Sequence, residues 1–414
     1  MPTTSDARLY AGAVNRWRDV VQTLGLVTAE GIRPTIFAEM SALAARTGAV
    51  NLGQGFPDVD GPDVVLEAAV AALRSGRNQY APGDGIAELR RAVATHQRAH
   101  YGLDPDPDTE VIVTTGATEA ITAAVLAFAG PGDDVVVVEP YYDSYAAATA
   151  LAGARLVTVG LLPGPEGFRL DRAALAAAIG PATRVVIVNS PHNPTGTVLP
   201  TEDLAELGRL AAAADAVVVT DEVYEHLTYD GVRHVPLATL PGMAERTLTV
   251  SSAGKTLSLT GWKVGWATGP AELVTAVRAV KQFLTYTSGA PLQPAIAAAL
   301  VDPAVDAWVR DLAASLAERR DLLCAGLTAA GFDVVVPAGT YFVVADGRAF
   351  DDDGAHLCRT LPERAGVVGV PVSAFCRPGG PVAEQLRSWV RFTFCKRGEV
   401  LADGVERLGR LQRR

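Results

Sequence analysis

The sequence predicts an α/β protein with a mostly parallel, seven-stranded sheet in a large domain and a smaller α+β domain. From about Asp63 onward, short apolar runs rich in β-branched residues alternate with longer Ala/Leu-rich segments. This pattern is typical of strands covered on both faces by helices. After about Pro291 the chain has fewer candidate strands and more candidate helix. At 414 residues it is long enough for two domains.

The elements follow in order along the chain. A short helix is expected over Val14–Leu24, before a break at Gly31–Pro34. Seven runs are candidate strands of the large sheet: Glu110–Val113, Asp134–Glu139, Arg155–Val159, Arg184–Asn189, Ala216–Thr220, Thr247–Ser251 and Lys263–Thr268. A long helix over Pro294–Ala330 then leads into candidate strands at Phe332–Val336, Thr340–Ala345 and Trp389–Thr393. We therefore expect an N-terminal arm (1–33), a first segment of the small domain (34–62), the large domain (63–293) and the small C-terminal domain (294–414).

Composition excludes several classes of function. The net charge of -10 disfavours binding to nucleic acid, whose phosphates repel an acidic chain. No apolar run approaches the roughly 18 residues that suggest a membrane span. The four cysteines are scattered and the six histidines form no HExxH motif, so no metal site is expected. With no secretory signal in the first thirty residues, we expect a cytoplasmic protein.

Polar and turn residues follow five of the candidate strands. In open α/β sheets, ligands bind beyond the carboxyl ends of the strands, so one site is expected where these ends converge. The segments are Thr115–Thr118, Glu139–Tyr142, Ser190–Pro194, Asp221–Glu222 and Ser252–Lys255.

Lys255 directly follows a buried-looking strand. A lysine held at such a place can be partly desolvated, which lowers its pKa and frees the amine for Schiff-base chemistry. For a lysine considered in isolation, a surface position at a strand end is the better interpretation. A phosphate-binding P-loop is excluded, because Thr249 stands where that motif needs a glycine.

Asp221 also follows a strand. A buried aspartate is costly unless it is paired with a cation. A protonated pyridine nitrogen is such a partner, and an aspartate beside it would keep the ring an electron sink. In isolation, Asp221 is more often a helix N-cap. Tyr224, three residues later, could reach the same ring and bind its phenolate oxygen.

Asn193 has Pro191 before it and Pro194 and Gly196 after it. The simplest interpretation is a rigid turn, but the same rigidity would fix an amide donor against a ligand. His192, its neighbour, is expected to be structural.

A small-residue turn at Gly116 opens a helix after a strand, so Ala117 and Thr118 would present free backbone amides to an anion such as phosphate. Ser252 would add a hydroxyl group and Lys263 a positive charge. As an isolated signal this turn is weak, and no GxGxxG motif supports dinucleotide binding.

Arg391 is embedded in an apolar strand. Buried arginines are rare unless paired, and the planar guanidinium suits a carboxylate. An internal salt bridge is an equally good interpretation of this residue alone.

The order and spacing of these residues resembles the fold-type I class I/II aminotransferases, which depend on pyridoxal 5'-phosphate. Further motifs resemble the branch that contains kynurenine–glutamine and methionine aminotransferases: Asn51–Pro57, Asn78–Tyr80 and Glu139–Tyr145. Within it, the chain is similar to actinobacterial proteins assigned as N-succinyldiaminopimelate aminotransferases, through Thr35–Leu43, Asp221–Leu227 and Val390–Arg397. The likeness runs from about Pro34 to the C-terminus.

The resemblance implies a role for each matching residue. Lys255 would carry the cofactor as a Schiff base and move the substrate proton, with Asp221 on the pyridine nitrogen. The other implied cofactor contacts are Asn193, Tyr224, Tyr142, Ala117, Thr118, Ser252, Lys263 and, from a partner subunit, Tyr80. Arg391, Gly55 and Asn193 would hold the substrate, while Phe37 stands where kynurenine-type enzymes have a tryptophan. A two-fold homodimer follows from the role of Tyr80.

The implied reaction is ping-pong transfer of an amino group from an amino acid to a 2-oxo acid, with N-succinyl-LL-2,6-diaminopimelate and 2-oxoglutarate as the expected pair. Three alternatives remain at this stage: a broad kynurenine, glutamine or methionine aminotransferase, a cysteine-S-conjugate β-lyase, and a non-enzymatic regulator. The regulator is disfavoured because the arm of about thirty residues is short for a DNA-binding domain and is not strongly basic.

Overall fold

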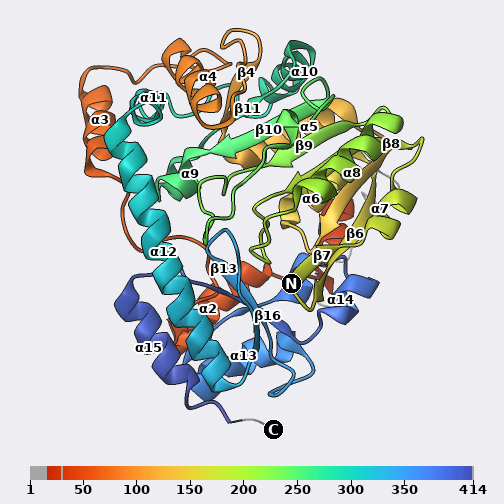
Figure 1. The fold of residues 1–414 in the computed structure, drawn as a ribbon, viewed down its shortest axis with the longest axis vertical. Helices are drawn as coiled ribbons and strands as arrows, with labels where there is room; N and C mark the ends of the chain where they lie inside the picture. Colours follow the sequence, from red (N-terminus) through yellow and green to blue (C-terminus); the bar gives the residue numbers. More distant parts are fainter. Residues whose placement is uncertain (1–15, 29–30, 413–414) are drawn as a thin grey trace, which may run out of the picture.

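The computed structural model describes residues 16–28 and 31–412, with the larger of its two main sheets above the smaller in Figure 1. The larger sheet has eight strands in the order β4-β11-β10-β9-β8-β5-β6-β7. Their bounds in that order are β4 Val111–Thr115, β11 Val264–Thr268, β10 Thr247–Ser252, β9 Val217–Asp221, β8 Thr183–Asn189, β5 Asp134–Glu139, β6 Arg155–Gly164 and β7 Gly167–Leu170.

The α/β fold class and the seven predicted strands of this sheet are confirmed. The central strands β10, β9, β8, β5 and β6 are parallel, whereas β11 runs antiparallel to both of its neighbours. The eighth strand, β7, forms an antiparallel hairpin with β6. Its four residues are too few to show a clear period in the sequence.

Alternate valines of the central strands face opposite layers of helix. In β5, Val135 and Val137 pack in the same core as helices α5 and α6, whereas Val136 and Val138 pack with α7 and α8. All four valines are almost fully buried. The sheet is therefore covered on both faces, as its uninterrupted apolar strands predict. These helices are α5 Gly116–Phe128, α6 Asp143–Ala152, α7 Arg172–Ala178 and α8 Thr201–Ala213.

The smaller sheet is antiparallel, in the order β12-β13-β16-β15. Its strands are β12 Asp333–Val335, β13 Phe342–Asp346, β16 Trp389–Thr393 and β15 Val370–Pro371. A separate parallel pair joins β3 (Val50–Asn51) to β14 (Val367–Val368), so an N-terminal segment lies beside the C-terminal part of the chain. The division of the chain into domains stays a prediction.

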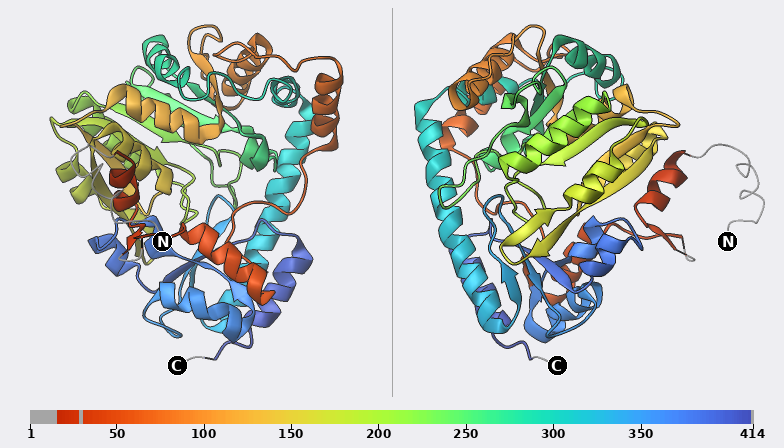
Figure 2. Two further views of the ribbon diagram at one scale, coloured as in Figure 1. Left: turned by 180° about the vertical axis from the view of Figure 1, so that it is seen from behind. Right: turned by 45° about the vertical axis from the view of Figure 1, so that its right-hand side comes forward.

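The single long helix predicted over Pro294–Ala330 is wrong. The structure has two helices here, α11 (Gln293–Ala299) and α12 (Pro303–Ala330). The break comes at Asp302, whose side chain accepts a hydrogen bond of 2.8 Å from Ala304 N and so caps α12. Pro303 has no N–H to continue the preceding helix, but it is well suited to a first helical position. In Figures 1 and 2, α12 runs along one side of the molecule from the level of the large sheet to the small one.

The N-terminal arm contains helix α1 (Arg16–Thr23), which packs against α6. The first two residues of the predicted helix lie outside the described residues. At the predicted break, β1 (Val27–Thr28) pairs with β2 (Gly31–Ile32). The remaining helices are α2 Ile36–Thr47, α3 Asp63–Arg74, α4 Ala87–Tyr101, α9 Ala253–Thr256, α10 Ala271–Lys281, α13 Gly354–Ala365, α14 Pro381–Gln385 and α15 Gly398–Leu408, with 3₁₀ turns η2 Leu237–Thr239, η3 Thr260–Trp262 and η4 Val372–Phe375.

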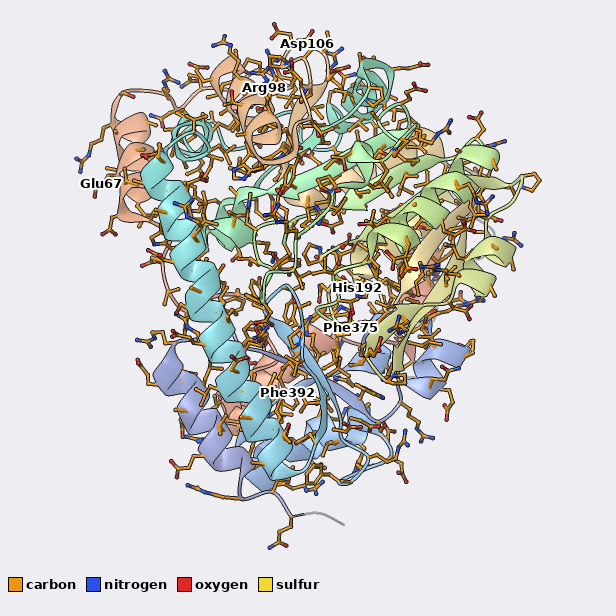
Figure 3. All side chains as sticks on the ribbon, viewed as in Figure 1. Glu67, Arg98, Asp106, His192, Phe375 and Phe392 are labelled. Atoms are coloured by element: carbon orange, nitrogen blue, oxygen red, sulfur yellow. The ribbon has the colours of Figure 1, made fainter. Side chains whose placement is uncertain are left out.

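The interior between the two sheets is also filled by side chains. In Figure 3, Glu67, Arg98 and Asp106 lie at the periphery, whereas His192 lies between the two sheets and Phe375 and Phe392 lie deeper in the lower part. Each of these last three residues is at most 1% exposed. Among the described helices, none combines the length and the apolar character needed to cross a bilayer.

Candidate active site

The carboxyl ends of the large sheet's strands meet in one pocket on the side of the small sheet. The strand ends predicted to converge do so, because segments after β4, β5, β8, β9 and β10 all line this pocket. The predicted site residues among its lining are Ala117, Thr118, Tyr142, Asn193, Asp221, Tyr224, Ser252, Lys255 and Lys263.

Lys255 lies in α9, the single helical turn that follows β10. Burial lowers the pKa of its amine to about 8, opposed by the attraction of nearby acidic groups such as Asp221. Its Nζ is 5.9 Å from the ring centroids of both Tyr224 and Tyr341. The alternative interpretation, a surface lysine, is therefore wrong. A larger fraction of this amine is neutral at physiological pH than for an ordinary lysine, and the neutral form is the nucleophile.

Asp221 is the last residue of β9 and is 5% exposed. Its Oδ2 accepts a hydrogen bond of 2.5 Å from the Tyr145 hydroxyl group. Burial raises the pKa of this carboxyl group, while the Tyr145 hydroxyl and the positive charge of Lys255 oppose the shift. The alternative helix N-cap is wrong, because no α-helix begins directly after Asp221. A buried carboxylate facing a pocket is suited to a cationic ligand atom.

The backbone of Asn193 is held by the side chain of a second asparagine, Asn189. Asn189, at the end of β8, accepts a hydrogen bond of 2.7 Å from Asn193 N and donates one of 2.7 Å to Asp221 O. Asn189 thus ties the loop after β8 to the end of β9. Tyr224 is 3% exposed, and its ring contacts the Tyr341 ring edge-on at 5.3 Å between centroids.

The first turn of α5 forms the opposite wall of the pocket. Thr115, the residue before the helix, makes no side-chain cap hydrogen bond, so the first amides of a long helix are available to an anion. Gly116 has φ of +71°, and a Cβ at this position would lie 3.1 Å from Lys263 Nζ. Gly265 is packed just as tightly, since a Cβ there would lie 2.6 Å from the Gly116 carbonyl carbon. These glycines allow a backbone nest with a lysine beside it.

Arg391 lies outside the pocket lining but directly beside it, on β16. Its Nη1 donates to Asn193 Oδ1 at 3.0 Å and its Nη2 to Gly53 O at 2.8 Å. The guanidinium lies between the rings of Phe342 and Phe375, at 4.0 and 4.5 Å from their centroids. It is 2% exposed, and burial lowers its pKa to about 10.

The predicted alternative for Arg391, an internal salt bridge, is wrong for the described residues. No carboxylate among them lies within 4.0 Å of its nitrogens, although Asp143 attracts it at longer range. Its Nε is buried without a hydrogen-bond partner. A buried cation left without a counterion is costly, and a ligand carboxylate would remove that cost.

Two further predicted substrate residues adjoin Arg391. The ring of Phe37 lies 5.6 Å from the Arg391 Cζ and meets the Phe375 ring edge-on. Gly55 O accepts a hydrogen bond of 2.8 Å from the Tyr341 hydroxyl group. A Cβ at Gly55 would lie 2.2 Å from the Phe342 ring, so only glycine fits there.

Tyr80 is not brought to this pocket. It is 82% exposed and contacts Tyr286 edge-on at 5.5 Å between ring centroids. His192, expected to be structural, is buried, with a pKa lowered by burial to about 4 and its Nδ1 2.9 Å from Thr195 Oγ1. The sequence assigns no role to the supporting residues Tyr145, in the first turn of α6, and Asn189, the last residue of β8.

The comparisons agree with this geometry. A lysine, an aspartate and a helix N-terminus around one pocket of a mostly parallel sheet are the groups that an enzyme dependent on pyridoxal phosphate needs. The family model for aminotransferase class I and II matches residues 47–408, and the chain belongs to this family. It therefore moves an amino group between an amino acid and a 2-oxo acid, with pyridoxal 5'-phosphate as its cofactor.

Two relatives are similar over nearly their whole length. The probable N-succinyldiaminopimelate aminotransferase of Mycobacterium tuberculosis is 55% identical, covering 94% of this chain and 99% of the relative. The solved structure of the M. tuberculosis enzyme has a TM-score of 0.89, with 96% of this chain and 99% of that chain covered. The methionine aminotransferase of Escherichia coli is 39% identical, covering 91% of this chain and 96% of the relative.

The pocket fits the cofactor at its pyridine nitrogen, its aldehyde carbon and its phosphate. The buried Asp221 matches a protonated pyridine nitrogen, and Lys255 matches the aldehyde carbon. The uncapped first turn of α5, with Gly116 and Lys263, matches a phosphate.

Proposed function

We propose that this enzyme transfers the amino group of N-succinyl-LL-2,6-diaminopimelate to 2-oxoglutarate, in lysine and diaminopimelate biosynthesis. The observation that carries the substrate is the 55% identity, over 94% of the chain, to the M. tuberculosis protein named for it. The methionine aminotransferase, at 39%, is more distant.

In this proposal the pocket residues divide among the cofactor's polar groups. Lys255 holds the aldehyde carbon, Asp221 the pyridine nitrogen, and Asn193 with Tyr224 the ring oxygen. Tyr142 packs on the ring. Phosphate is held by Ala117, Thr118, Ser252 and Lys263, together with Tyr80 of a partner subunit.

Pyridoxal phosphate, when bound, supplies the electron sink that makes a proton on the substrate Cα removable. The chain's own groups do the rest. Lys255, displaced by the incoming amino group, becomes a free amine whose low pKa suits it to take the Cα proton. Asp221, buried and held by Tyr145, keeps its negative charge beside the ring. The surrounding buried side chains exclude water from this proton transfer.

Arg391 binds the α-carboxylate of the substrate. The guanidinium is already fixed by Asn193 and Gly53 and sandwiched by two phenyl rings, so little conformational entropy is lost on binding. The substrate carboxylate supplies the counterion that this buried cation lacks.

A second cavity, next to Phe37, suits the distal end of the proposed substrate. It is lined by the arm, by α2, by Tyr141 and Asp143 and by the C-terminal part of the chain, and it includes Arg33 and Arg359. Arg359 Nε donates to Glu39 Oε1 at 2.6 Å, so this arginine is held in place at the rim. The substrate carries carboxylates at its far end, and two arginines are suited to them.

The active unit is a homodimer in this proposal. Several large apolar side chains are exposed, including Tyr80 and the Tyr286 ring that it contacts, and exposed apolar surface is typical of a subunit interface. They are Phe56, Tyr80, Phe283, Leu284 and Tyr286. Four free, buried cysteines are consistent with the cytoplasmic location expected from the sequence.

The test is a panel of amino donors, each mixed with the enzyme in a single turnover while the absorbance of the bound cofactor is followed. We expect the fastest loss of absorbance with N-succinyl-LL-2,6-diaminopimelate. A strong preference for methionine or kynurenine, with no response to the succinylated donor, would overturn the proposed substrate. Release of pyruvate from cystathionine without any oxo acid would indicate a β-lyase instead.

The distal cavity is tested by Arg359→Gln. We expect a higher KM for the succinylated donor and an unchanged KM for methionine, which has no distal carboxylate. An equal effect on both donors would mean that Arg359 is only structural.

A further inference from the structure

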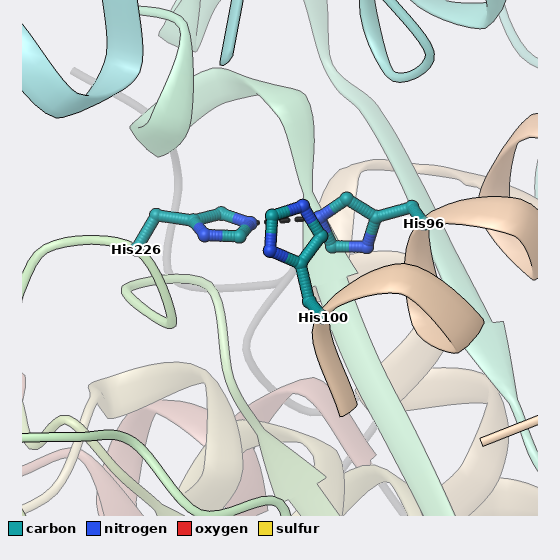
Figure 4. A group of neighbouring side chains, drawn as sticks. All are labelled: His96, His100 and His226. Carbon is teal, nitrogen blue, oxygen red and sulfur yellow. Dashed lines mark hydrogen bonds between the residues drawn. The ribbon is translucent and has the colours of Figure 1, made fainter. Parts of the chain in front are cut away.

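Three histidines meet away from the active site. His96 and His100 are one turn apart on α4, and His226 lies in the turn after β9 (Figure 4). One nitrogen atom from each ring lies within 4.8 Å of the others. The ring centroid of His100 lies 4.4 Å from that of His96 and 4.9 Å from that of His226. One nitrogen atom of each ring therefore lies close enough to the other two for a small shift to bring all three onto one ion.

The contact between His96 and His226 is unusual. Their Nε2 atoms are 2.7 Å apart. His96 is 4% exposed, and its Nδ1 has no hydrogen-bond partner among the described atoms. Since no hydrogen bond holds the other side of this ring, it is free to shift by the few tenths of an ångström that a shared ligand would require.

Acidic groups surround the three rings. Asp306, near the start of α12, has its Oδ1 3.7 Å from His100 Nε2. Glu225, next to His226, is 5% exposed; it accepts hydrogen bonds from Ser251 and Tyr101, and its negative charge acts on both His96 and His226. This negative charge favours a cation among the imidazoles.

We propose that His96, His100 and His226 bind a divalent transition-metal ion, with Zn²⁺ the best fit. Three imidazoles are a common ligand set for zinc, with Zn–N distances of about 2.0–2.1 Å. Tetrahedral geometry at those distances places ligand nitrogens about 3.3 Å apart, which lies between the 2.7 Å contact and the 4.8 Å limit seen here. A water molecule or Asp306 completes the coordination.

The site would connect three segments that are distant in sequence. The ligands come from α4 and from the turn after β9, and Asp306 belongs to α12. Tyr224 lies in the same turn and Asp221 ends the strand before it, so the ion would fix the turn without touching the pocket, because none of the three histidines lines it. Its role is structural, and the expected effect is on stability.

Exposure makes the site reachable and testable. His100 side chain is 29% exposed, so an ion can reach the cluster from solvent. For the same reason, His100→Ala should leave folding unchanged. His356, whose side chain is 64% exposed and paired with Asp351, is a matched control away from the cluster.

The experiment uses the tag-free holoenzyme, stripped with a chelator and then titrated with Zn²⁺. We expect one equivalent of tightly bound zinc, measured by elemental analysis after dialysis, and a higher Tm. Replacing Zn²⁺ by Co²⁺ should give the visible absorption bands of a tetrahedral site. His100→Ala and His226→Gln each remove or replace a direct ligand and should weaken zinc binding by at least about 100-fold, since loss of an outer-shell partner alone costs about 10- to 100-fold.

His356→Ala should leave both the stoichiometry and the affinity unchanged. The proposal is overturned if wild-type protein retains less than about a tenth of an equivalent of zinc under conditions where a three-histidine site is stable. It is also overturned if His100→Ala and His226→Gln bind zinc as tightly as His356→Ala does. In either case, the contact between His96 and His226 is an N–H···N hydrogen bond and no more.

Discussion

A hydrogen bond of 3.0 Å from Arg391 Nη1 to Asn193 Oδ1 joins the small sheet to the loop after β8. In the proposed mechanism, Arg391 binds the substrate and Asn193 binds the cofactor. The two binding events therefore share one contact, and each residue orients the other.

The first prediction concerns the shape of the guanidinium. Arg391→Lys keeps the positive charge but loses the planar fork, and with it the second hydrogen bond to a carboxylate. Loss of one charge-assisted hydrogen bond costs about 1.5–3 kcal/mol, so kcat/KM for the amino donor should fall about 10- to 150-fold. Steady-state kinetics at saturating oxo acid measures this. The exposed Arg387→Lys is the control, and an unchanged kcat/KM in Arg391→Lys would refute the role.

The second prediction compares loss of the Asp221 carboxylate with loss of the hydrogen bond that Tyr145 donates to it. Asp221→Asn removes the buried charge, which should cost about 3–5 kcal/mol and lower kcat by about 150- to 4,000-fold. Tyr145→Phe removes only the hydroxyl group that hydrogen-bonds Asp221, so its loss should be about tenfold.

The pH profile distinguishes these two variants further. The Tyr145 hydroxyl lowers the pKa of Asp221, so without it the pKa rises and activity should be lost at a higher pH as the solution is acidified. Asp221→Asn has no carboxyl group to titrate and should show no such change. A Tyr145→Phe profile identical to that of the wild type would contradict the assignment.

The third prediction follows from the pKa of Lys255, about 8. In the apoenzyme, its amine is protonated and unreactive below that pH and becomes neutral above it. Competitive labelling with acetic anhydride, followed by mass spectrometry of the Lys255 peptide, should rise with a midpoint near pH 8. The same peptide in urea-unfolded protein should titrate near the ordinary value of about 10.4. Equal midpoints in the two states would show that burial does not activate this lysine.

The fourth prediction uses two glycines that share a conformation. Gly116 and Gly132 have φ of +71° and +96°, so alanine at either costs about 1–2 kcal/mol of backbone strain. Only at Gly116 does the added Cβ meet Lys263 Nζ. Gly116→Ala should therefore weaken binding of pyridoxal phosphate about tenfold or more, whereas Gly132→Ala should not. Absorbance titration of both apoproteins decides this, and equal affinities would remove α5 from the phosphate site.

The fifth prediction tests the shared active site. Lys255→Ala and Tyr80→Ala homodimers should both have low activity. If Tyr80 serves the partner's pocket, random mixing of the two should restore about a quarter of wild-type activity, because half of the dimers then contain one intact site out of two. No recovery after subunit exchange, verified by sedimentation or native mass spectrometry, would place Tyr80 outside the partner's site.

Much of this site could be predicted because the end of a buried strand is recognised in the sequence as the end of an apolar run. Asp221, Ser252 and Lys255 each follow an apolar run, and parallel strands bring such ends together. The sequence left the partner of Arg391 open, because a strand pattern does not show whether a buried cation has an internal counterion. Only the packing of Phe342 and Phe375 around it, with no carboxylate in contact, decides between the two interpretations.

Other features depend on contacts that local patterns do not encode. The break at Asp302 is caused by one capping side chain and one proline, and the helical pattern of the sequence is otherwise continuous there. The histidine cluster joins residues 130 positions apart. The spacing of His96 and His100, four residues on one helix, was the available signal, but it gains meaning only when β9 places His226 opposite.

The cofactor-binding residues follow the strand ends, whereas the second cavity is lined mainly by the arm, by α2 and by the C-terminal part of the chain, with Tyr141 and Asp143 from the segment after β5. For protein engineering, this means that residues of the second cavity can be substituted without changing any residue that lines the cofactor pocket. Substitutions around Phe37 and Arg359 can be screened for new amino donors while the reactive centre is left intact. The amino-transfer chemistry would then stay the same while the preference for the amino donor changes.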